Sequence, residues 1–386
     1  MSNTSQVITR LMECMALKSP TPPGDVAEVA NWIEVWGTEF GAIIERQTVE
    51  PGKDNLLMTL EFGPGPTLVF NSHMDVNNPN GQKWSNPPFE PRIIGNRLYG
   101  VGACDAKGSL VSMLAAMERL ARDQSELCGK LVLTAVMGEE AGGIGSLHLV
   151  NEGIEADGAV VGEPTQLEVC TAHKGTYMRR LGFRGLESHS GRPDLGVNSI
   201  VHAAHFVLEY EKLKKQLIKQ PHPLLGPASA EVTIIRGGTR QNTIPGYTEM
   251  IIDRRLLPGE THAKADGELE TVLANTKKAV PSLQVENIDI LVATIPSETH
   301  SSERIVEIAL DAVSHVMKSV NQPKGFPAGC DMSKLVTIAN IPTVIIGPGS
   351  LTQAHAPDEF VEIVQVEQAV DVYENIARRF LKKVSK

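Results

Sequence analysis

Short apolar runs alternate with segments of helical periodicity along the first part of the chain, and this alternation restricts the fold more than any other feature. Residues 108–122, for example, have helical spacing and lie between two such runs. The runs that predict buried strands lie at 55–62, 67–71, 130–137 and 158–162. Strands that alternate with helices predict a mainly parallel sheet with helices on both faces. In such a sheet, ligands bind beyond the carboxyl ends of the strands.

A different order of elements begins after residue 177. The strand-like segments lie at 177–185, 230–236, 248–256 and 283–292, and helical spacing covers 198–218 and 261–279. This β-α-β-β-α-β order is the split βαβ, or ferredoxin-like, arrangement. We therefore predict an α/β protein with two domains. Residues 1–177 and 294–386 form a mixed, mainly parallel sheet domain, and residues 178–293 form an inserted lid.

Length, charge and cysteine content narrow the class of protein. A chain of 386 residues allows two domains. The net charge of −10 disfavours a nucleic-acid or anionic-membrane partner, because proteins that bind these normally present a basic surface. No apolar run reaches the roughly 20 residues of a membrane-spanning helix, and the first ten residues do not resemble a secretory signal. The five cysteines include no C-x-x-C pair, so we expect reduced thiols and a cytoplasmic location.

Histidine and acidic residues gather where the predicted strands end or a helix begins. These residues are His73, Asp75, Asp105, Glu139, Glu140, Glu163 and His355. Taken alone, each has an ordinary explanation, such as a helix cap for an aspartate or a helix start for a pair of glutamates. Together they place oxygen and imidazole donors on one edge of the predicted sheet. Burying such groups is costly unless they pair with one another or bind a metal.

These donor types suit a metal-dependent hydrolase. Two histidines with carboxylates favour zinc, cobalt or manganese, and a bridging carboxylate would hold two ions about 3.5–4 Å apart. The pair Glu139 and Glu140 offers one metal ligand and one spare carboxylate. A spare carboxylate beside an activated water is what general-base hydrolysis requires.

Eight motifs occur in a fixed order between residues 72 and 359. They are S-H-M-D-V (72–76), W-S-N-P-P-F (84–89), Y-G-V-G-A-C-D-A-K-G (99–108), M-G-E-E-A-G-G-I-G-S (137–146), G-E-P-T (162–165), H-K-G (173–175), H-S-G-R-P-D-L-G-V-N-S-I (189–200) and A-H-A-P-D-E (354–359). The ordered set resembles the dinuclear zinc amidohydrolases that include acetylornithine deacetylase, succinyl-diaminopimelate desuccinylase, aminoacylases and glutamate carboxypeptidase. The arrangement is most similar to the acetylornithine deacetylase branch.

This resemblance implies two divalent ions, with zinc as the first choice and cobalt or manganese as alternatives. Asp105 would bridge both ions. His73 and Glu163 would complete one ion's site, and Glu140 and His355 the other. No ligand position is missing or substituted, which counts against a metal-free relative.

The remaining acidic residues have implied roles in the chemistry. Glu139 would take a proton from the water between the ions and pass it to the leaving nitrogen. Asp75 would hold the imidazole of His73 in the correct tautomer. With Glu rather than Asp at position 163, the sequence resembles the family's deacylases and carboxypeptidases, whose substrates have a free carboxylate, rather than its aminopeptidases.

The predicted lid supplies most of the candidate substrate contacts. His189 resembles the family histidine that reaches the substrate's carbonyl oxygen from a partner subunit, so the lid would also form a homodimer. Asn242 and Arg255 resemble residues that bind the substrate's carboxylate. The alternative is that Asn242 is a turn residue and that Arg255 pairs with Asp253. Gly329, outside the lid, is either a backbone contact to substrate or a turn glycine.

We therefore expect metal-dependent hydrolysis of the amide bond in a small N-acyl amino acid or short peptide with a free carboxylate. Three alternatives remain open at this point. The first is a succinyl-diaminopimelate desuccinylase, a metallo-carboxypeptidase or a dipeptidase. The second is a non-catalytic binding protein on the same fold, and the third is a cysteine hydrolase with Cys104 as its nucleophile.

Overall fold

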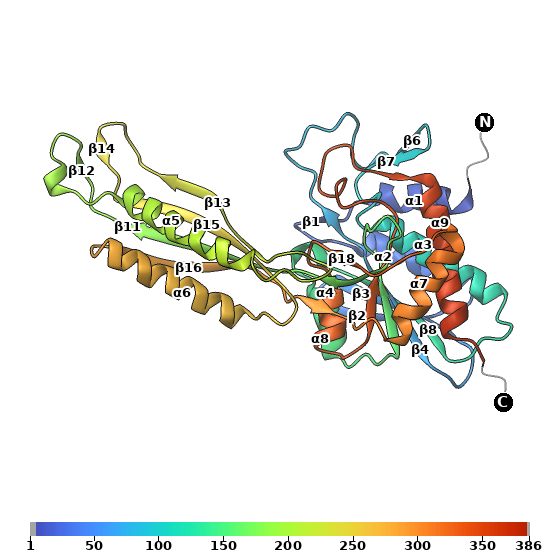
Figure 1. Ribbon diagram of the computed structural model, residues 1–386. Coiled ribbons are helices and arrows are strands. Elements are labelled where there is room, and N and C mark those ends of the chain that lie inside the picture. The colour runs from blue at the N-terminus through green and yellow to red at the C-terminus, as the bar shows by residue number, and fades with distance from the viewer. Residues whose placement is uncertain (1–4, 384–386) are drawn as a thin grey trace. The chain divides into compact units, whose positions relative to one another are not determined.

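The computed structural model describes residues 5–383, and the chain divides into two compact units (Figure 1). The first contains the chain up to Thr171, the segment Glu298–Phe326 and the chain from Cys330 onward. The second contains Ala172–Ser297 and Pro327–Gly329. The first four residues of the stretch tested for a secretory signal lie outside the described residues. Within residues 5–383, no helix has both the length and the apolar character needed to cross a membrane.

The first unit is built on a mixed sheet. Its four central strands pair in parallel in the order β19 (Thr343–Ile345), β9 (Gly158–Val161), β4 (Thr67–His73) and β8 (Lys130–Val136). Antiparallel strands flank them: β3 (Lys53–Glu61) and β2 (Ile43–Glu50) continue beyond β8, and β10 (Cys170–His173) pairs with β19. The short strands β17 (Ser297–Glu298) and β18 (Lys324–Phe326) both pair with β10. The α/β class predicted from the sequence is confirmed, although the sequence reading did not include β2.

Helices pack against this sheet in two groups. One contains α1 (Gln6–Ala16), α2 (Ala27–Glu39), α3 (Lys107–Arg122), α7 (Arg304–Met317) and α9 (Ile363–Phe380), and the other contains α4 (Ile144–Asn151) and α8 (Met332–Thr337). The strands between them are buried almost continuously, as β4 illustrates, because both faces of the sheet are covered. In the core, the rings of Phe70 on β4 and Tyr373 on α9 lie 5.5 Å apart between centroids.

Short strands at the edge of the first unit hold its loops. β6 (Arg92–Ile94), β7 (Arg97–Tyr99) and β20 (Phe360–Glu362) form one small antiparallel sheet. β1 (Pro20–Thr21) pairs in parallel with β5 (Val76–Asn77), which follows β4 directly. These pairings connect segments that are far apart in the sequence to the loops around the carboxyl ends of the central strands.

The second unit is a four-stranded antiparallel sheet with two helices. Its elements follow in the order β11 (Gly175–Arg184), α5 (Ser199–Leu217), β13 (Ser229–Gly237), β15 (Tyr247–Leu256), α6 (His262–Ala279) and β16 (Gln284–Ala293). The strand order in the sheet is β13-β15-β11-β16. Every second residue of β15 is buried, because one face of the sheet packs on the helices. A separate ribbon pairs β12 (Ser188–His189) with β14 (Thr243–Ile244).

Candidate metal centre

The predicted ligand residues lie around the carboxyl ends of the central strands. His73 is the last residue of β4, Glu163 follows β9, and the 3₁₀ turn η1 (Glu139–Ala141) follows β8. Asp105 lies two residues before the first residue of α3, and His355 lies in the loop between β19 and β20. Because β4, β8 and β9 are parallel neighbours, these strands end at the same edge of the sheet.

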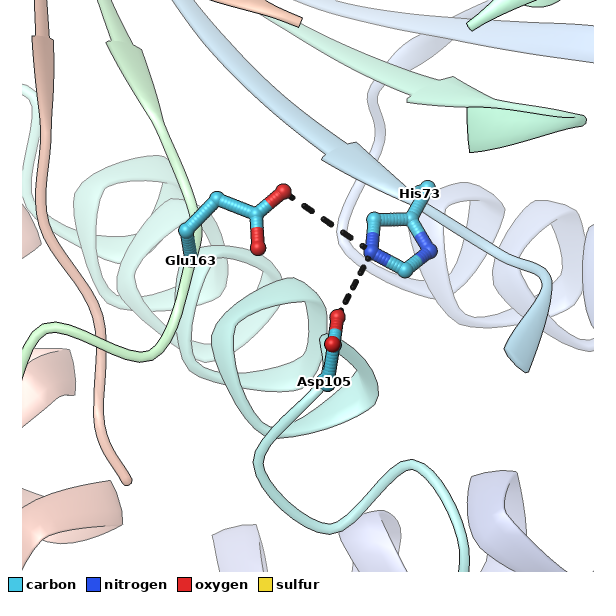
Figure 2. Close-up of side chains that lie close together, drawn as sticks. All are labelled: His73, Asp105 and Glu163. Carbon is cyan, nitrogen blue, oxygen red and sulfur yellow. Dashed lines mark hydrogen bonds and ion pairs between the residues drawn. The ribbon is translucent and has the colours of Figure 1, made fainter. Parts of the chain in front are cut away.

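Three buried side chains form a first triad, which Figure 2 shows. The imidazole Nε2 of His73 lies 3.1 Å from Oδ1 of Asp105 and 3.9 Å from Oε1 of Glu163. One donor atom from each of the three residues lies within 4.8 Å of the other two. This spacing allows the three donors to surround one cation.

A second triad shares Asp105 with the first. The Nε2 atom of His355 lies 3.3 Å from Oδ2 of Asp105 and 3.0 Å from Oε2 of Glu140. The two carboxylate oxygens of Asp105 therefore approach different histidines. A carboxylate in this position can contribute one oxygen to each of two neighbouring cations.

The charges in the two triads and on the adjacent Glu139 favour cation binding. Burial raises the pKa of Glu163 well above its ordinary value, and the nearby negative charge of Asp105 raises it further. Burial likewise raises the pKa of Glu139 to about 8. Hydrogen bonds with Asp105 and Glu140 raise the pKa of His355 to about 11. Buried carboxyl groups thus outnumber the cationic groups available to neutralise them, and the oxygen and imidazole donors fit two divalent ions.

The tautomer of His73 suits a metal ligand. Its Nδ1 atom lies 2.9 Å from the backbone carbonyl oxygen of Asp75, whereas the Asp75 carboxylate is farther away at 3.6 Å. A carbonyl oxygen can only accept, so Nδ1 donates to it, and Nε2, which faces the carboxylates of the triad, is the nitrogen that would bind a metal once it gives up its proton. Asp75, which the sequence predicts to orient this ring, thus faces Nδ1 with its backbone carbonyl and, at the longer distance, with its carboxylate.

The Asp75 carboxylate also holds the turn that carries the two glutamates. It accepts the backbone N–H groups of Glu139 at 3.2 Å and Glu140 at 3.3 Å, and the hydroxyl of Thr21 at 2.8 Å. Asp75 is fully buried, so these bonds replace its lost hydration. Sequence reasoning missed Thr21, which lies in a Pro- and Gly-rich cluster that predicts only a turn.

Two further supports of this turn were also missed. The side chain of Asn55, buried in β3, accepts from the N–H of Met137 at 3.1 Å and donates to the carbonyl of Gly145 at 2.9 Å. Asp331 and Lys334 form a buried ion pair at 3.2 Å, and their charges act on Glu139. No motif pointed to these residues, because each acts on a segment distant in sequence.

Cys104 lacks the properties of a nucleophile. It is fully buried, and burial raises the pKa of its thiol well above the ordinary value, with further contributions from Glu359 and Asp105. A reactive thiolate needs a lowered pKa and access to substrate. The structure therefore counts against a cysteine hydrolase centred on Cys104.

Among the candidate substrate contacts in the second unit, His189 and Asn242 lie together. His189 on β12 is paired with Thr243 on β14, and the N–H of Ser190 donates to the carbonyl oxygen of Asn242 at 2.9 Å. Both His189 and Asn242 are exposed. Their side chains are thus available to a ligand or to another protein surface.

Arg255 and Gly329 belong to a different part of the same unit. The guanidinium of Arg255 donates to Asp253 at 3.1 and 3.0 Å and to the hydroxyl of Thr176 at 2.8 Å. The N–H of Thr176 donates to Oγ1 of Thr294 at 2.8 Å. A Cβ atom placed on Gly329 would lie 3.1 Å from that same Oγ1. The hydrogen bonds of Arg255 thus include the pairing with Asp253 that the sequence left as an alternative.

Comparison with known proteins agrees with the resemblance seen in the motifs. Residues 69–379 match the model of peptidase family M20/M25/M40. An acetylornithine deacetylase from Proteus mirabilis is 29% identical over 357 residues, which cover 91% of this chain and 88% of that protein. An acetylornithine deacetylase from Photorhabdus laumondii is 31% identical over 340 residues, covering 86% and 85% respectively.

Solved structures share the fold over nearly the whole chain. The aminopeptidase PepT from Bacillus cereus superposes with a TM-score of 0.79 at 21% identity, covering 98% of each chain. A metallo-carboxypeptidase of the M20 family from Sulfolobus solfataricus has a TM-score of 0.79 at 19% identity, covering 98% of this chain and 99% of that one. A dinuclear metal-binding M20 peptidase from Bacillus subtilis has a TM-score of 0.73 at 16% identity, covering 97% and 98%.

Because Asp105 belongs to both triads, the number of bound metal ions tests the arrangement. Metal-free protein dialysed against buffered Co²⁺ is expected to hold about two ions per chain by elemental analysis. His355→Ala removes a donor from the second triad only, so about one ion should remain. The control, His300→Ala, changes an exposed histidine outside both triads and should keep both ions. Loss of both ions, or retention of both, in His355→Ala would contradict two triads joined by Asp105.

Proposed function

Because the chain belongs to peptidase family M20/M25/M40 and is a hydrolase of that family, we propose that it cleaves the amide bond of a small N-acyl amino acid, with N-acetylornithine as the first candidate. The main structural support is that Asp105 approaches a histidine in each of two triads while Glu139 belongs to neither. This arrangement provides for two ions and a separate proton carrier. Succinyl-diaminopimelate desuccinylase and carboxypeptidase or dipeptidase activities are the alternatives.

The residues of the two triads would hold the metal ions. His73, Asp105 and Glu163 would bind one ion, and Asp105, Glu140 and His355 the other, with zinc as the proposed metal and cobalt or manganese as alternatives. When bound, the ions would supply Lewis-acid chemistry, lowering the pKa of water and polarising the acyl carbonyl.

Glu139 would carry the proton that the reaction transfers. Its backbone is fixed by the Asp75 carboxylate, and its neighbour Glu140 belongs to the second triad, so Glu139 is a free carboxylate held beside the ligands. It would accept a proton from the attacking water as the water oxygen bonds to the acyl carbon, and it would deliver that proton to the departing nitrogen as the C–N bond breaks. A group that takes and returns one proton in this way lets the amine leave in neutral form.

The second unit would recognise the free carboxylate of the substrate. Arg255 is half-buried, and Lys174 lies close enough that burial and the Arg255 charge lower the Lys174 pKa. Two cations with one paired carboxylate, Asp253, leave positive charge for an anionic group. Glu163 agrees with this proposal, because Glu at this position resembles the family members that act on such substrates. Gly329 would contribute a backbone contact.

A homodimer would complete the active site. His189 on β12 is paired with Thr243 on β14, just before β15 begins at Tyr247, whereas Arg255 lies near the other end of β15. The 10 residues of β15 span roughly 30 Å, which is longer than a small acyl amino acid. One copy therefore cannot place both groups on one substrate, so His189 and Asn242 would act on the substrate held by the partner.

Exposed apolar residues support the proposed dimer surface, and free cysteines support the proposed location. On the second unit, α5 and the adjacent edge strand β13 expose large apolar side chains that a second copy would cover: Ile200, Val201, Leu208 and Ile235. All five cysteines are free, in agreement with a cytoplasmic location. Cell fractionation tests the location, and recovery with secreted or membrane fractions would contradict it.

A substrate panel tests the proposed activity. Purified enzyme loaded with Zn²⁺ or Co²⁺ is assayed on N-acetylornithine, N-succinyl-diaminopimelate, other N-acetyl amino acids and dipeptides. We expect the highest kcat/KM for an acyl amino acid, a large loss when its carboxylate is converted to an amide, and no turnover after chelation until metal is restored. Turnover that is unaffected by chelation would contradict the metal requirement. A clear preference for dipeptides would favour the peptidase alternative.

Glu139→Gln separates proton transfer from metal binding. The amide keeps the size of the side chain but cannot accept the proton, so kcat should fall by about 10²–10⁴-fold while both ions stay bound. Glu152→Gln, an exposed control at the end of α4, should retain normal kinetics and metal content. Near-normal kcat for Glu139→Gln would remove this residue from the mechanism.

Mixing two inactive variants tests whether His189 acts on the partner's substrate. Glu139→Gln and His189→Ala are co-expressed with different tags. A mixed dimer would have one centre with both defects and one with neither, and about half of randomly paired dimers are mixed, so about a quarter of wild-type activity should return. If His189 serves its own chain, the mixture stays as inactive as its components.

A further inference from the structure

A buried carboxylate outside both triads binds the loop that carries the shared ligand. Glu359 is only 3% exposed. Its Oε1 atom accepts the backbone N–H groups of Cys104 at 2.9 Å and Asp105 at 3.1 Å. Its Oε2 atom accepts the N–H of Gly102 at 3.1 Å. One carboxylate therefore takes three hydrogen bonds from a single turn.

This contact is reinforced by the backbone on either side. The N–H of Gly100 donates to the carbonyl oxygen of Glu359 at 2.9 Å. The following strand, β20, pairs with β7, and Phe360 lies opposite Tyr99. The loop between β7 and α3 is thus closed onto the segment that contains Glu359, from its first residue to Asp105.

The carboxylate oxygens of Glu359 are satisfied by backbone N–H groups. Among residues 5–383, no Lys, Arg or His side chain forms an ion pair with it. Successive N–H groups that converge on one point form a concave anion site. Here the anion is part of the chain itself. Without it, three buried N–H groups would lose their acceptor, and the turn would lose the interaction that determines its shape.

The position of Glu359 connects the two triads. His355 lies four residues earlier in the same segment and belongs to the second triad, whereas Asp105 belongs to both. From these contacts we infer that Glu359 is a positioning residue for the metal centre, holding the shared carboxylate Asp105 in register with His355. The inference rests on the proposed two-ion assignment. Groups that orient metal ligands through hydrogen bonds typically change metal affinity by about 10–100-fold when they are removed.

The test compares two Glu→Gln substitutions on the same segment. Glu359→Gln keeps the side-chain size but replaces one acceptor oxygen with an N–H₂ group that faces N–H donors. The matched control is Glu362→Gln on β20, because within the described part of the chain the Glu362 carboxylate accepts from the side chains of Asn96 and Arg97 and not from the Asp105 turn. Metal-free proteins are titrated with Co²⁺ without substrate, following cobalt absorption and bound ion content, and apo-protein melting is measured in parallel.

Glu359→Gln should bind both ions about 10–100-fold more weakly, because both triads use Asp105. His355→Ala should lose only one ion, and Glu362→Gln should bind Co²⁺ like the wild type. Wild-type affinity for both ions in Glu359→Gln, or a loss confined to one ion, would overturn the inference.

If Glu359→Gln does not fold, Glu359→Asp decides the question, because it keeps the charge but retracts the carboxylate. Weakened binding of both ions by folded Glu359→Asp supports the inference, and wild-type binding refutes it. Failure of both variants to fold would also refute it, since Glu359 would then support the fold as a whole. A wild-type protein that binds two ions but hydrolyses no acyl amino acid would overturn only the proposed function.

Discussion

The carboxylate of Asp105 approaches two imidazoles, and the rest of the metal centre is arranged around this contact. One oxygen lies 3.1 Å from His73 and the other 3.3 Å from His355. Neither triad has three donors without Asp105. Its exact placement therefore decides whether two ions can be bound together. That placement cannot come from Asp105 alone, because the residue lies in a loop rather than in a strand or helix.

Buried polar side chains from distant segments fix the loops of the centre through their backbones. Glu359 binds the turn that contains Asp105, Asp75 binds the turn that contains Glu139 and Glu140, and Asn55 binds the end of β8. In each case a side chain with no direct place in the triads satisfies buried N–H groups. Such groups are costly to leave unpaired, so each loop has one strongly preferred shape. The charged ligands themselves are then free to bind metal instead of holding the fold.

In the second unit, the main feature is the separation of the candidate substrate contacts. Its antiparallel sheet separates two groups of candidate substrate contacts along the length of β15, with His189 and Asn242 beyond one end and Arg255 near the other. A single small substrate cannot bridge that length, which is the physical reason for proposing a dimer. The same long sheet gives Arg255 a rigid support, since Asp253 and Thr176 hold its guanidinium on two neighbouring strands.

The sequence by itself determined the α/β class and brought forward the donors of both triads. The class followed because strand–helix alternation is local, and a metal site was expected because parallel strands end at a common edge. The assignment of individual ligands came from the ordered motifs that resemble a known family. It did not reveal β2, an edge strand whose half-exposed residues lack an apolar run. Only the tertiary structure decided that the carbonyl of Asp75 contacts His73, that its carboxylate holds the Glu139 turn, and that Glu359 holds Asp105. The last contact joins residues 254 positions apart, and no local periodicity records a hydrogen bond between segments so distant.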